Sequence, residues 1–542
     1  MSGGTATLTT SSLALGVQSI TATYGGDSTY AASNATAITV AITSPDNAQV
    51  GATANPQVAA YTFTLQFPGT VTVNFGTTTS YGFTTSAQHF AAGTQSTILV
   101  AGMLVSTAYH MQSTIAYDSG ATQTDPDLTF TTGASPPGFN PTFTVATTPG
   151  LTPQPGIELV DLLSNPDVPY ATDLQGNVIW TYLFPDQQTT GSYPTIIYPV
   201  KLQTNGHFIG LVAPESQLVL TNGPIPPTTL NYVREFDLAG NVVRQLAMSD
   251  LNARLATAGF NLTLQLFSHD FATLPNGHIL VIANTLKSVV LTGASTPTTV
   301  LGDVVVDLDP NFNPVWVWNE FDHLDVNRQP MGFPDWTHSN AIAYSPDDGN
   351  FLISIRHQNW IIKVDYNNGA GAGDIIWKLG YQGDFTLQPS ASYPSVVDPT
   401  NWFYAQHDVN FASTNTTGTF SLGVMDNGDD RVFPAGVTCN TAPNPPCLYT
   451  TAQVLQVNET TKTASFVFLQ QLPMNLYSSF AGNTRLQPNG NVEYNLAGAG
   501  SDAYVFEVTP TTTPQNVWQM HIINNNTYRA FRIPSLYPGV QW

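Results

Sequence analysis

One sequence unit recurs six times from about residue 156 onward, and it limits the folds open to the chain. Each copy is a β-run ending in an acidic or Asn residue, a polar turn, and a second β-run that usually carries Trp. The turn residues are Asp173, Asp237, Asp307, Asp365, Asn458 and Glu507. A second hairpin separates the copies, as in L-Q-T-N-G-H-F-I-G and L-P-N-G-H-I-L-V. Two hairpins make four strands, so the sequence predicts an all-β fold in which residues 136–542 form a six-bladed β-propeller.

The residues before the repeat show a different β pattern. Residues 1–43 hold short alternating runs cut by Gly-Gly and Ser or Asn turns, and S-I-T-A-T-Y-G-G-D-S-T-Y resembles part of a bacterial Ig-like module. Residues 44–135, with V-A-A-Y-T-F-T-L-Q-F and G-T-V-T-V-N-F-G, resemble a fibronectin type III module. Neither module carries a recognisable group of catalytic or metal-binding residues, so we expect N-terminal β-sandwiches that serve as spacers or docking units.

The chain is acidic and poor in charged residues. Its 14 Lys and Arg residues stand against 36 Asp and Glu residues, a net charge of −22, and no Lys or Arg precedes Lys201. Nucleic acid and anionic membrane surfaces are therefore excluded as partners. No apolar run reaches the length of a membrane span. An anionic small molecule can bind only where the few cations gather, which makes Arg356 informative.

The two cysteines, Cys439 and Cys447, lie in C-N-T-A-P-N-P-P-C. Their spacing suits a disulfide across a short loop, and no further metal ligands stand nearby. A disulfide points to an oxidising compartment. The segment M-S-G-G-T-A-T-L-T-T lacks the basic region and apolar core of a signal peptide. We therefore expect a periplasmic or extracellular protein whose export signal lies upstream of this sequence.

One stretch concentrates polar chemistry: D-W-T-H-S-N-A-I-A-Y-S-P-D-D-G-N-F-L-I-S-I-R, residues 335–356. Two β-rich runs flank a P-D-D-G-N turn centred near residue 348, which puts Asn340 opposite Arg356. His338 lies two residues before Asn340 and projects from the same strand face. An imidazole, a carboxamide and a guanidinium in one patch predict a site for an anion.

His269, His338 and His407 open the first hairpin of three successive repeats, at two equal intervals of 69 residues. Because inner strands of a propeller line its central channel, these imidazoles should converge beside Asn340 and Arg356. A three-histidine metal site competes with this interpretation, but a guanidinium cannot ligate a metal and repels a divalent ion. We predict no metal and no cofactor. The histidines outside this register are expected to be ordinary polar positions: His278, His323 and His357.

Several segments resemble the bacterial aryl-sulfate sulfotransferases that use no PAPS: D-W-T-H-S-N-A-I, L-I-S-I-R-H-Q-N-W-I-I-K-V-D, I-I-W-K-L-G, Y-A-Q-H-D-V-N-F, D-N-G-D-D-R and Y-R-A-F-R-I-P-S-L-Y. The resemblance spans most of residues 140–542. It implies an exported, disulfide-bearing six-bladed propeller with an N-terminal β-sandwich. Such an enzyme moves a sulfuryl group from a phenolic sulfate ester to another phenol, by a ping-pong mechanism through a sulfohistidine.

Carried onto this sequence, the resemblance implies His407 as the nucleophile, with His269 as a further active-site histidine. It assigns the binding of the sulfuryl group to His338, Asn340 and Arg356. A neutral imidazole, with a pKa of about 6.5, is available as a nucleophile at neutral pH. Either His269 or His338 could protonate the leaving phenolate and deprotonate the incoming phenol, and the sequence leaves this choice open.

Aromatic substrates need a stacking surface, for which the candidates are Trp336, Tyr404 and Tyr528. The expected partners are a phenolic sulfate donor and a phenolic acceptor, and a homodimer is allowed. Two other functions stay open at this point. One is a non-catalytic propeller that serves as a surface scaffold or glycan binder. The other is a hydrolase that uses the same histidines on sulfate or phosphate esters.

Overall fold

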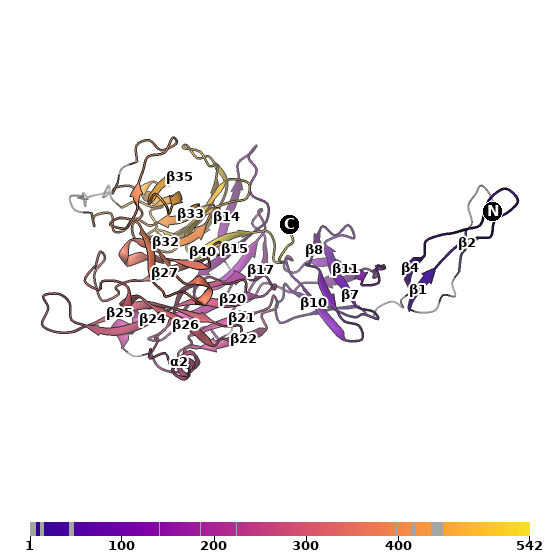
Figure 1. Cartoon of the computed structure of the whole chain (residues 1–542), viewed down its shortest axis with the longest axis horizontal. Helices are drawn as coiled ribbons and strands as arrows, with labels where there is room; N and C mark the ends of the chain where they lie inside the picture. The colour runs from indigo at the N-terminus through magenta and orange to yellow at the C-terminus, as the bar shows by residue number, and fades with distance from the viewer. Residues whose placement is uncertain are drawn as a thin grey trace. The chain divides into compact units, whose positions relative to one another are not determined.

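Nearly all of the regular structure is β-strand, which confirms the all-β class (Figure 1). The computed structural model describes residues 7–10, 13, 16–42, 48–139, 141–184, 186–223, 225–396, 398–414, 418–434 and 448–542. The chain divides into a first unit, residues 1–135 with 534–542, and a second unit, residues 136–533. Cys439 and Cys447 lie outside the described residues, so their disulfide stays a prediction. None of the described helices is long and apolar enough to cross a membrane.

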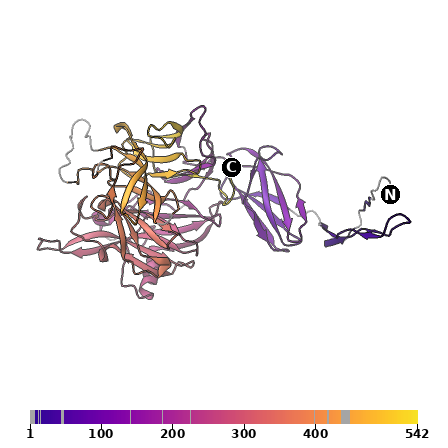
Figure 2. The ribbon, with the colours of Figure 1, turned by 45° about the horizontal axis from the view of Figure 1, so that its top comes forward.

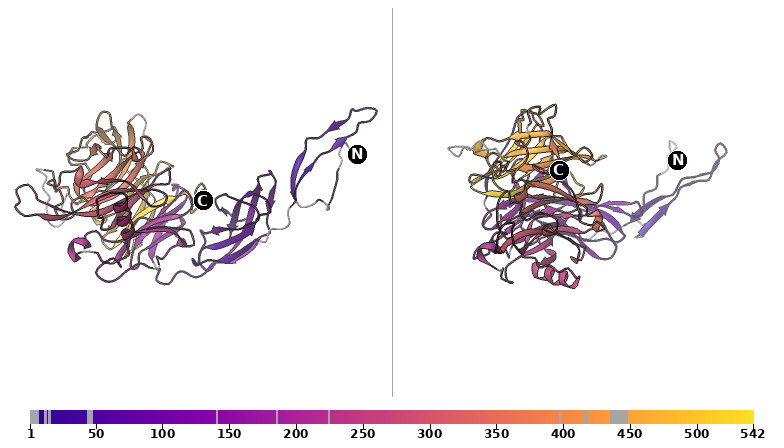
Figure 3. Two further views of the ribbon diagram at one scale, coloured as in Figure 1. Left: turned by 60° about the horizontal axis from the view of Figure 1, so that its bottom comes forward. Right: turned by 60° about the vertical axis from the view of Figure 1, so that its left-hand side comes forward.

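The described residues of the second unit form six sheets of four or five strands, packed side by side (Figures 2 and 3). In bonding order, the first sheet contains β17 (Val178–Thr181), β16 (Val168–Thr172), β15 (Ile157–Leu163) and β40 (Asn526–Ile533). The second contains β18 (Thr195–Ile197), β20 (Phe208–Pro214), β21 (Tyr232–Phe236) and β22 (Val242–Ala247), with β19 (Lys201–Leu202) also on β20. The third contains β23 (Phe267–Thr273), β24 (Ile279–Val289), β25 (Thr298–Leu308) and β26 (Pro314–Asn319).

The other three sheets complete the second unit. The fourth contains β27 (Ser339–Ser345), β28 (Asn350–Ile355), β29 (Trp360–Val364) and β30 (Ile375–Leu379). The fifth contains β31 (Thr386–Leu387), β35 (Thr463–Gln471), β34 (Thr451–Asn458), β33 (Thr419–Asp426) and β32 (His407–Phe411). The sixth contains β14 (Thr142–Thr147), β39 (Asn516–Ile523), β38 (Asp502–Val508), β37 (Val492–Ala499) and β36 (Asn483–Leu486). Short helices lie between strands: α1 (Leu218–Asn222), α2 (Met248–Thr257), η1 (Glu320–Asp322), η2 (Arg356–Gln358), η3 (Asn367–Gly369) and η4 (Met474–Leu476).

The first and last strands of the second unit each pair with a sheet formed by the opposite end of the unit. Its first strand, β14, completes the sixth sheet by pairing with β39, and its last strand, β40, completes the first sheet by pairing with β15. Figure 1 shows the C-terminal strand β40 beside β15. The first and sixth sheets are therefore each built from chain segments that lie hundreds of residues apart in sequence.

Apolar side chains join each sheet to the next. Every residue of β20, β28 and β37 is buried, because both faces of these middle strands pack on neighbours. Buried clusters connect the second sheet to the third, the third to the fourth, the fourth to the fifth and the fifth to the sixth. Trp180 of the first sheet stacks on Phe208 of the second with ring centroids 4.7 Å apart. Another cluster joins the sixth sheet to the first through residues such as Val505 and Tyr170.

Tryptophans of the repeat add hydrogen bonds between the same neighbours. Each indole N–H donates to a main-chain carbonyl of another sheet at 2.8–2.9 Å: Trp180 to Leu238, Trp318 to Gly373 and Trp518 to Leu174. The last of these bonds links the sixth sheet to the first. The tryptophan of the repeat unit thus makes a contact between successive sheets.

Two predicted turn residues are wrong. In the sixth copy Glu507 lies inside β38, and the turn N–H of Gln515 donates to the Thr509 hydroxyl at 2.9 Å. In the third copy the carboxylate of Asp309, not Asp307, accepts the main-chain N–H groups of Asn311 and Asn313, each at 2.8 Å. Asp307 instead accepts the Tyr366 hydroxyl at 2.6 Å. The sequence V-D-L-D-P offers two carboxylates at this turn, and only the second has the spacing that the hairpin requires.

The described part of the first unit contains two larger sheets and two short ladders. One sheet has β5 (Gln49–Ala52), β6 (Ala59–Thr64) and β10 (Gln95–Val100); the other has β7 (Gly69–Gly76), β8 (Phe83–Thr84), β9 (Gln88–Phe90), β11 (Ala108–Tyr117), β12 (Thr122–Thr124) and β13 (Leu128–Thr131). Buried and half-buried residues alternate along β6 and β7, as in sheets with one face on a core. The ladders pair β1 (Gly16–Ile20) with β4 (Ile38–Ile42), and β2 (Thr23–Tyr24) with β3 (Ser33–Asn34).

The C-terminal residues 534–542 belong to the first unit. The Tyr537 hydroxyl donates to the Leu99 carbonyl at 2.9 Å, and the Trp542 ring packs against Phe75 and Phe83. The sequence pattern had placed these residues with the repeat. The Ig-like and fibronectin-like character of the N-terminal modules stays a prediction.

We expect Trp518→Phe to destabilise the fold. The exchange removes the donor to Leu174 O from an indole that is 0% exposed. An unmade buried hydrogen bond and a smaller ring together should cost about 1–3 kcal/mol. Urea unfolding followed by tryptophan fluorescence measures the loss. Trp316→Phe is the control, because that indole is half-buried and its bond to Gly371 O is longer, 3.3 Å. An equal loss in both variants would contradict the prediction.

Candidate active site

The hairpin formed by β27 and β28 is confirmed, but its predicted register is wrong. A β-bulge between Ser339 and Ala341 makes Asn340 an extra residue on its strand. The main-chain N–H of Arg356 consequently donates to His338 O, at 3.3 Å, so Arg356 lies opposite His338 and not opposite Asn340. The turn sequence locates a hairpin but does not reveal a bulge beyond it, since the bulge is set by what packs on the strand.

The structure brings histidines from three sheets together. The rings of His269 and His338 meet edge to face with centroids 4.5 Å apart. His357 stacks on His338 at 4.6 Å, so the expectation that it is an ordinary polar position is wrong. His407, which is 3% exposed, lies close enough to His338 and His269 that a positive charge on either ring would lower its pKa. His269 and His338 have left-handed backbones, φ 52° and 51°, which turn their side chains out of the regular strand alternation.

Burial keeps the four imidazoles neutral. It is the largest cause that lowers the pKa of His338 and of His357, each to about 3. Burial likewise lowers the pKa of His269 and of His407 well below the usual value. The positive charge of Arg356 adds to the depression for all four. Neutral rings retain a nitrogen lone pair for nucleophilic attack or proton transfer.

Arg356 is held in a fixed orientation. Its Nη2 donates to Asp429 Oδ2 at 2.5 Å, and its Nη1 donates to His357 Nε2 at 2.7 Å. The Tyr477 hydroxyl donates to the other oxygen of Asp429 at 2.5 Å. Arg356 Nε is buried and has no hydrogen-bond partner among the described residues. A guanidinium with one unused donor, next to neutral rings, can bind an oxyanion.

Asn427 fixes the tautomer of His407. The Asn427 amide nitrogen donates to Ser478 O at 2.8 Å and to Ala481 O at 3.2 Å, which turns its carbonyl oxygen toward the histidine. His407 Nδ1 then donates to that oxygen at 2.7 Å. Nε2 therefore carries the lone pair. We did not predict Asn427, although it lies in the D-N-G-D-D-R segment that resembles the family.

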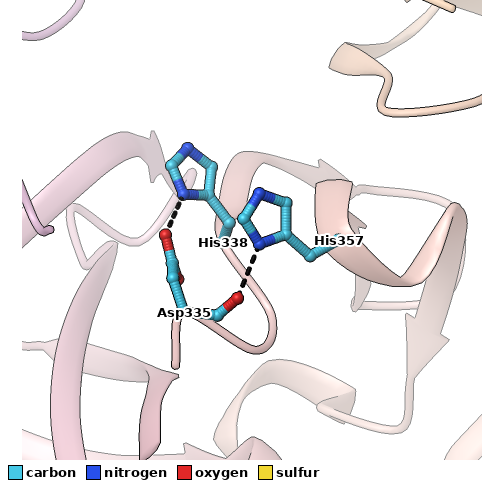
Figure 4. Close-up of side chains that lie close together, drawn as sticks. All are labelled: Asp335, His338 and His357. Carbon is cyan, nitrogen blue, oxygen red and sulfur yellow. Dashed lines mark hydrogen bonds and ion pairs between the residues drawn. The ribbon is translucent and has the colours of Figure 1, made fainter. Parts of the chain in front are cut away.

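His338 has a carboxylate partner that His269 lacks (Figure 4). His338 Nδ1 shares a hydrogen bond of 2.6 Å with Asp335 Oδ2, and both side chains are about 10% exposed. His269 Nδ1 lies 2.5 Å from the Ser268 hydroxyl instead. A carboxyl group releases and takes up a proton far more readily than a hydroxyl does, so the pair of Asp335 and His338 is better suited to proton transfer. The sequence reasoning missed Asp335, which lies three residues before His338.

Asp335, His338 and His357 offer ligand atoms within 4.8 Å of one another, a set that could hold a metal ion. Two imidazoles and a carboxylate are common ligands for zinc or iron. However, His357 Nδ1 donates to Asp335 O at 2.7 Å (Figure 4), and the Nε2 of His357 accepts from Arg356. Both ring nitrogens are thus in use, and the guanidinium occupies the direction from which a cation would approach.

The other predicted site residues fall into two groups. Tyr528 belongs to the histidine cluster: its hydroxyl donates to His269 O at 2.9 Å. Tyr198, which we did not predict, lies with its ring centroid 4.9 Å from that of His269, and its hydroxyl has no partner among the described residues. Trp336 and Tyr404 are fully buried, and their polar atoms donate to main-chain carbonyls, so they have the character of core residues.

Asn340 lies beneath the cluster. Its side-chain nitrogen donates to Gln406 O at 2.7 Å, next to His407, and its side-chain oxygen is buried without a partner among the described residues. Its main-chain carbonyl accepts from Arg529 Nη2 at 2.7 Å. The amide therefore couples the strand of His338 to the strand of His407.

Comparison with known proteins identifies the class. The sequence model of the family described as Arylsulfotransferase (ASST) matches residues 119–530. The chain belongs to this family, and the match supports aryl sulfotransfer in general as its activity. No curated protein matches the chain.

Among solved structures, the chain is similar to TolB from Acinetobacter baumannii, with 10% identity, a TM-score of 0.33, and 78% of this chain and 79% of that chain covered. A putative 6-phosphogluconolactonase from Bacteroides fragilis is also similar, with 10% identity, a TM-score of 0.32, and 86% and 98% covered. Likenesses at this level say nothing about sites or substrates.

We expect the transfer activity to lack the acid limb near pH 6.5 that an exposed histidine nucleophile would show. The depressed pKa of His407 keeps Nε2 unprotonated as the pH falls through its ordinary value of about 6.5, so activity is lost only at lower pH. Arg356→Gln removes a charge that depresses this pKa, so the limb should move to higher pH. The pH profile of phenol release from an aryl sulfate measures both effects.

Arg254→Gln is the matched control for this profile, because Arg254 lies on α2 and donates to Asn311 O. Its acid limb should coincide with that of the unmodified protein. A limb at about pH 6.5 that Arg356→Gln does not move would contradict the assignment of the neutral nucleophile.

Proposed function

We propose that this protein transfers a sulfuryl group from a phenolic sulfate ester to a second phenol, without PAPS, through a sulfohistidine at His407. The observation that carries the proposal is the contact between a fixed guanidinium with an unused Nε–H and a cluster of neutral imidazoles. Arg356 and the amide of Asn340 bind the sulfuryl oxygens, where negative charge gathers in the transition state.

In the first half-reaction, His407 Nε2 attacks sulfur and the bond between sulfur and the phenolic oxygen breaks. The leaving oxygen takes the Nε2 proton of neutral His338, while Asp335, whose pKa burial raises, passes its own proton to His338 Nδ1. The enzyme is then N-sulfonated on His407 and neutral on His338. In the second half-reaction, the acceptor phenol gives its proton to His338 Nε2 and its oxygen attacks sulfur. The bond between sulfur and His407 breaks, and both histidines return to their starting states.

The choice of His338 as the acid and base has a structural reason. Its Nδ1 is bonded to Asp335, so only Nε2 exchanges protons with substrate, and a proton can pass between the imidazole and the carboxyl group through that bond. Tyr198 and Tyr528 stand around His269 and offer aromatic surface for a phenol ring.

We also propose that the six sheets of the second unit are blades of a β-propeller. Contacts in cyclic order support this, including the sixth sheet packed on the first. One cavity, lined by strands of all six sheets, supports a common axis. A periplasmic or extracellular location is part of the proposal, and the short spacing of the two cysteines favours it.

We expect His407→Ala to abolish transfer and covalent labelling together. Intact-mass analysis after brief exposure to phenyl sulfate should show a gain of one sulfuryl unit on the unmodified protein, mapped to the peptide Asn401–Val409. His521→Ala is the control, because His521 pairs with Asp502 outside the histidine cluster. Retained transfer in the His407 variant would overturn the nucleophile. Phenol release that needs no acceptor would indicate a hydrolase. A lack of turnover with every aryl sulfate would indicate a non-catalytic scaffold or glycan binder.

We expect Asp335→Asn to slow transfer from phenyl sulfate by about 10²–10⁴-fold, the usual contribution of a positioned acid. The burst of phenol release should fall much less with 4-nitrophenyl sulfate, because its leaving group needs little protonation. Ser268→Ala tests the alternative partner, since Ser268 is bonded to His269. A larger and leaving-group-dependent loss in Ser268→Ala than in Asp335→Asn would assign the proton transfer to His269.

A further inference from the structure

A cavity lined by none of the cluster histidines lies beside an ion-paired layer around Arg529. Its volume is about 400 Å³, and strands of all six sheets of the second unit line it. One lining residue from each is Phe531, Lys201, Asp270, Tyr344, Phe411 and Arg485. Asp270 and Asp408 also line it, and each directly follows a histidine of the cluster, His269 and His407.

Arg529 forms the layer between the two sites. It is 1% exposed and pairs with Asp270 at 3.0 Å and with Asp408 at 3.5 Å. Arg529 therefore neutralises part of the charge of these two carboxylates, and Lys201 and Arg485 add further positive charge. Lys201, Arg485 and Arg529 face these two carboxylates, and Arg532, a further cation of the wall, pairs with Glu158, Glu493 and Glu507. Four cations around one cavity are unusual in a chain that holds only 14 Lys and Arg residues.

The cations of the cavity have unused donors. Arg485 pairs only loosely with Asp408, at 3.6 Å, and its Nε is buried without a hydrogen-bond partner among the described residues. Arg532 lines the same cavity; it is 1% exposed, and its Nη2 has no partner in the described part of the chain. Lys201 Nζ donates to Asp270 and to Phe271 O, so one of its three N–H bonds has no partner within the described ranges. Buried donors of this kind normally have an acceptor.

The remaining wall of the cavity is apolar and aromatic. Phe411 and Phe531 line it, and the guanidinium of Arg485 lies 4.6 Å from the centroid of the Phe531 ring. A volume of this size holds one small ring with a polar group. An inorganic ion alone would leave the aromatic wall without a partner.

We propose that this cavity binds a small aromatic organic anion, with its acidic group between Lys201 and Arg485 and its ring against Phe411 and Phe531. The site is separate from the sulfuryl-transfer site and does not depend on that function. The ligand class is an aryl carboxylate, or an aryl ester of an oxyacid with the same charge and size.

Titration calorimetry of the full chain with benzoate tests the proposal. We expect saturable binding that Arg485→Gln weakens by about tenfold or more, since a charge-assisted bond is lost. Lys287→Gln, an exposed cation in β24, should leave the affinity unchanged. Arg356→Gln should also leave it unchanged, because that residue belongs to the histidine cluster. Loss of binding in Arg356→Gln, or unchanged binding in Arg485→Gln, would overturn the proposal.

A measurement on the unmodified protein covers the case in which Arg485→Gln does not fold. A crystal soaked with 4-bromobenzoate should show an anomalous bromine peak between Phe411 and Phe531. A peak beside His269 or His407 alone, or no peak, would overturn the site while leaving the transfer function intact.

Discussion

The site depends on one constraint: four imidazoles are buried next to a single guanidinium. A buried positive charge needs a partner, and Arg356 has Asp429, which is itself bound by Tyr477. The same charge disfavours protonation of the rings around it. The neutral state of the imidazoles and a cation that can bind an anion are therefore consequences of one arrangement. If the guanidinium were free to swing into solvent, the rings would regain only part of their ordinary basicity, because burial is the larger cause of the lowered pKa.

The segment D-N-G-D-D-R, at the end of β33, makes most of the contacts that fix these side chains. Each polar residue of D-N-G-D-D-R has a separate contact: Asp426 with Arg431, Asn427 with His407, Asp429 with Arg356 and Asp430 with Asn359. Burial raises the pKa of both Asp429 and Asp430, that of Asp430 to about 6, and the charge of Arg356 opposes the rise at Asp429. One loop thus sets the tautomer of the proposed nucleophile and the orientation of the anion-binding group.

The sequence predicted the features that depend on periodicity. Equal spacing located His269, His338 and His407 because equivalent positions of successive repeats start equivalent strands. It failed where a single residue breaks the period. The bulge at Asn340 shifted the partner of Arg356, and His357 joined the cluster through the 3-10 turn that follows β28.

The supporting residues were harder to predict for another reason. Asp335, Asn427 and Tyr198 act through contacts between segments far apart in sequence or through a chain reversal that no short pattern encodes. Asp335 had a local signal, a carboxylate three residues before a histidine, but that spacing is common. Asn427 was visible only through family resemblance. The buried layer around Arg529 had no sequence signal beyond the scarcity of cations.

The exchange of end strands has a consequence for how the protein is made. The first sheet lacks β40, and the sixth lacks most of its strands, until the final part of the chain leaves the ribosome. The middle sheets can assemble during synthesis, whereas the two outer ones must wait. Formation of the first and sixth sheets is therefore a late event with a large loop-closure cost, and nascent chains carry open strand edges until release.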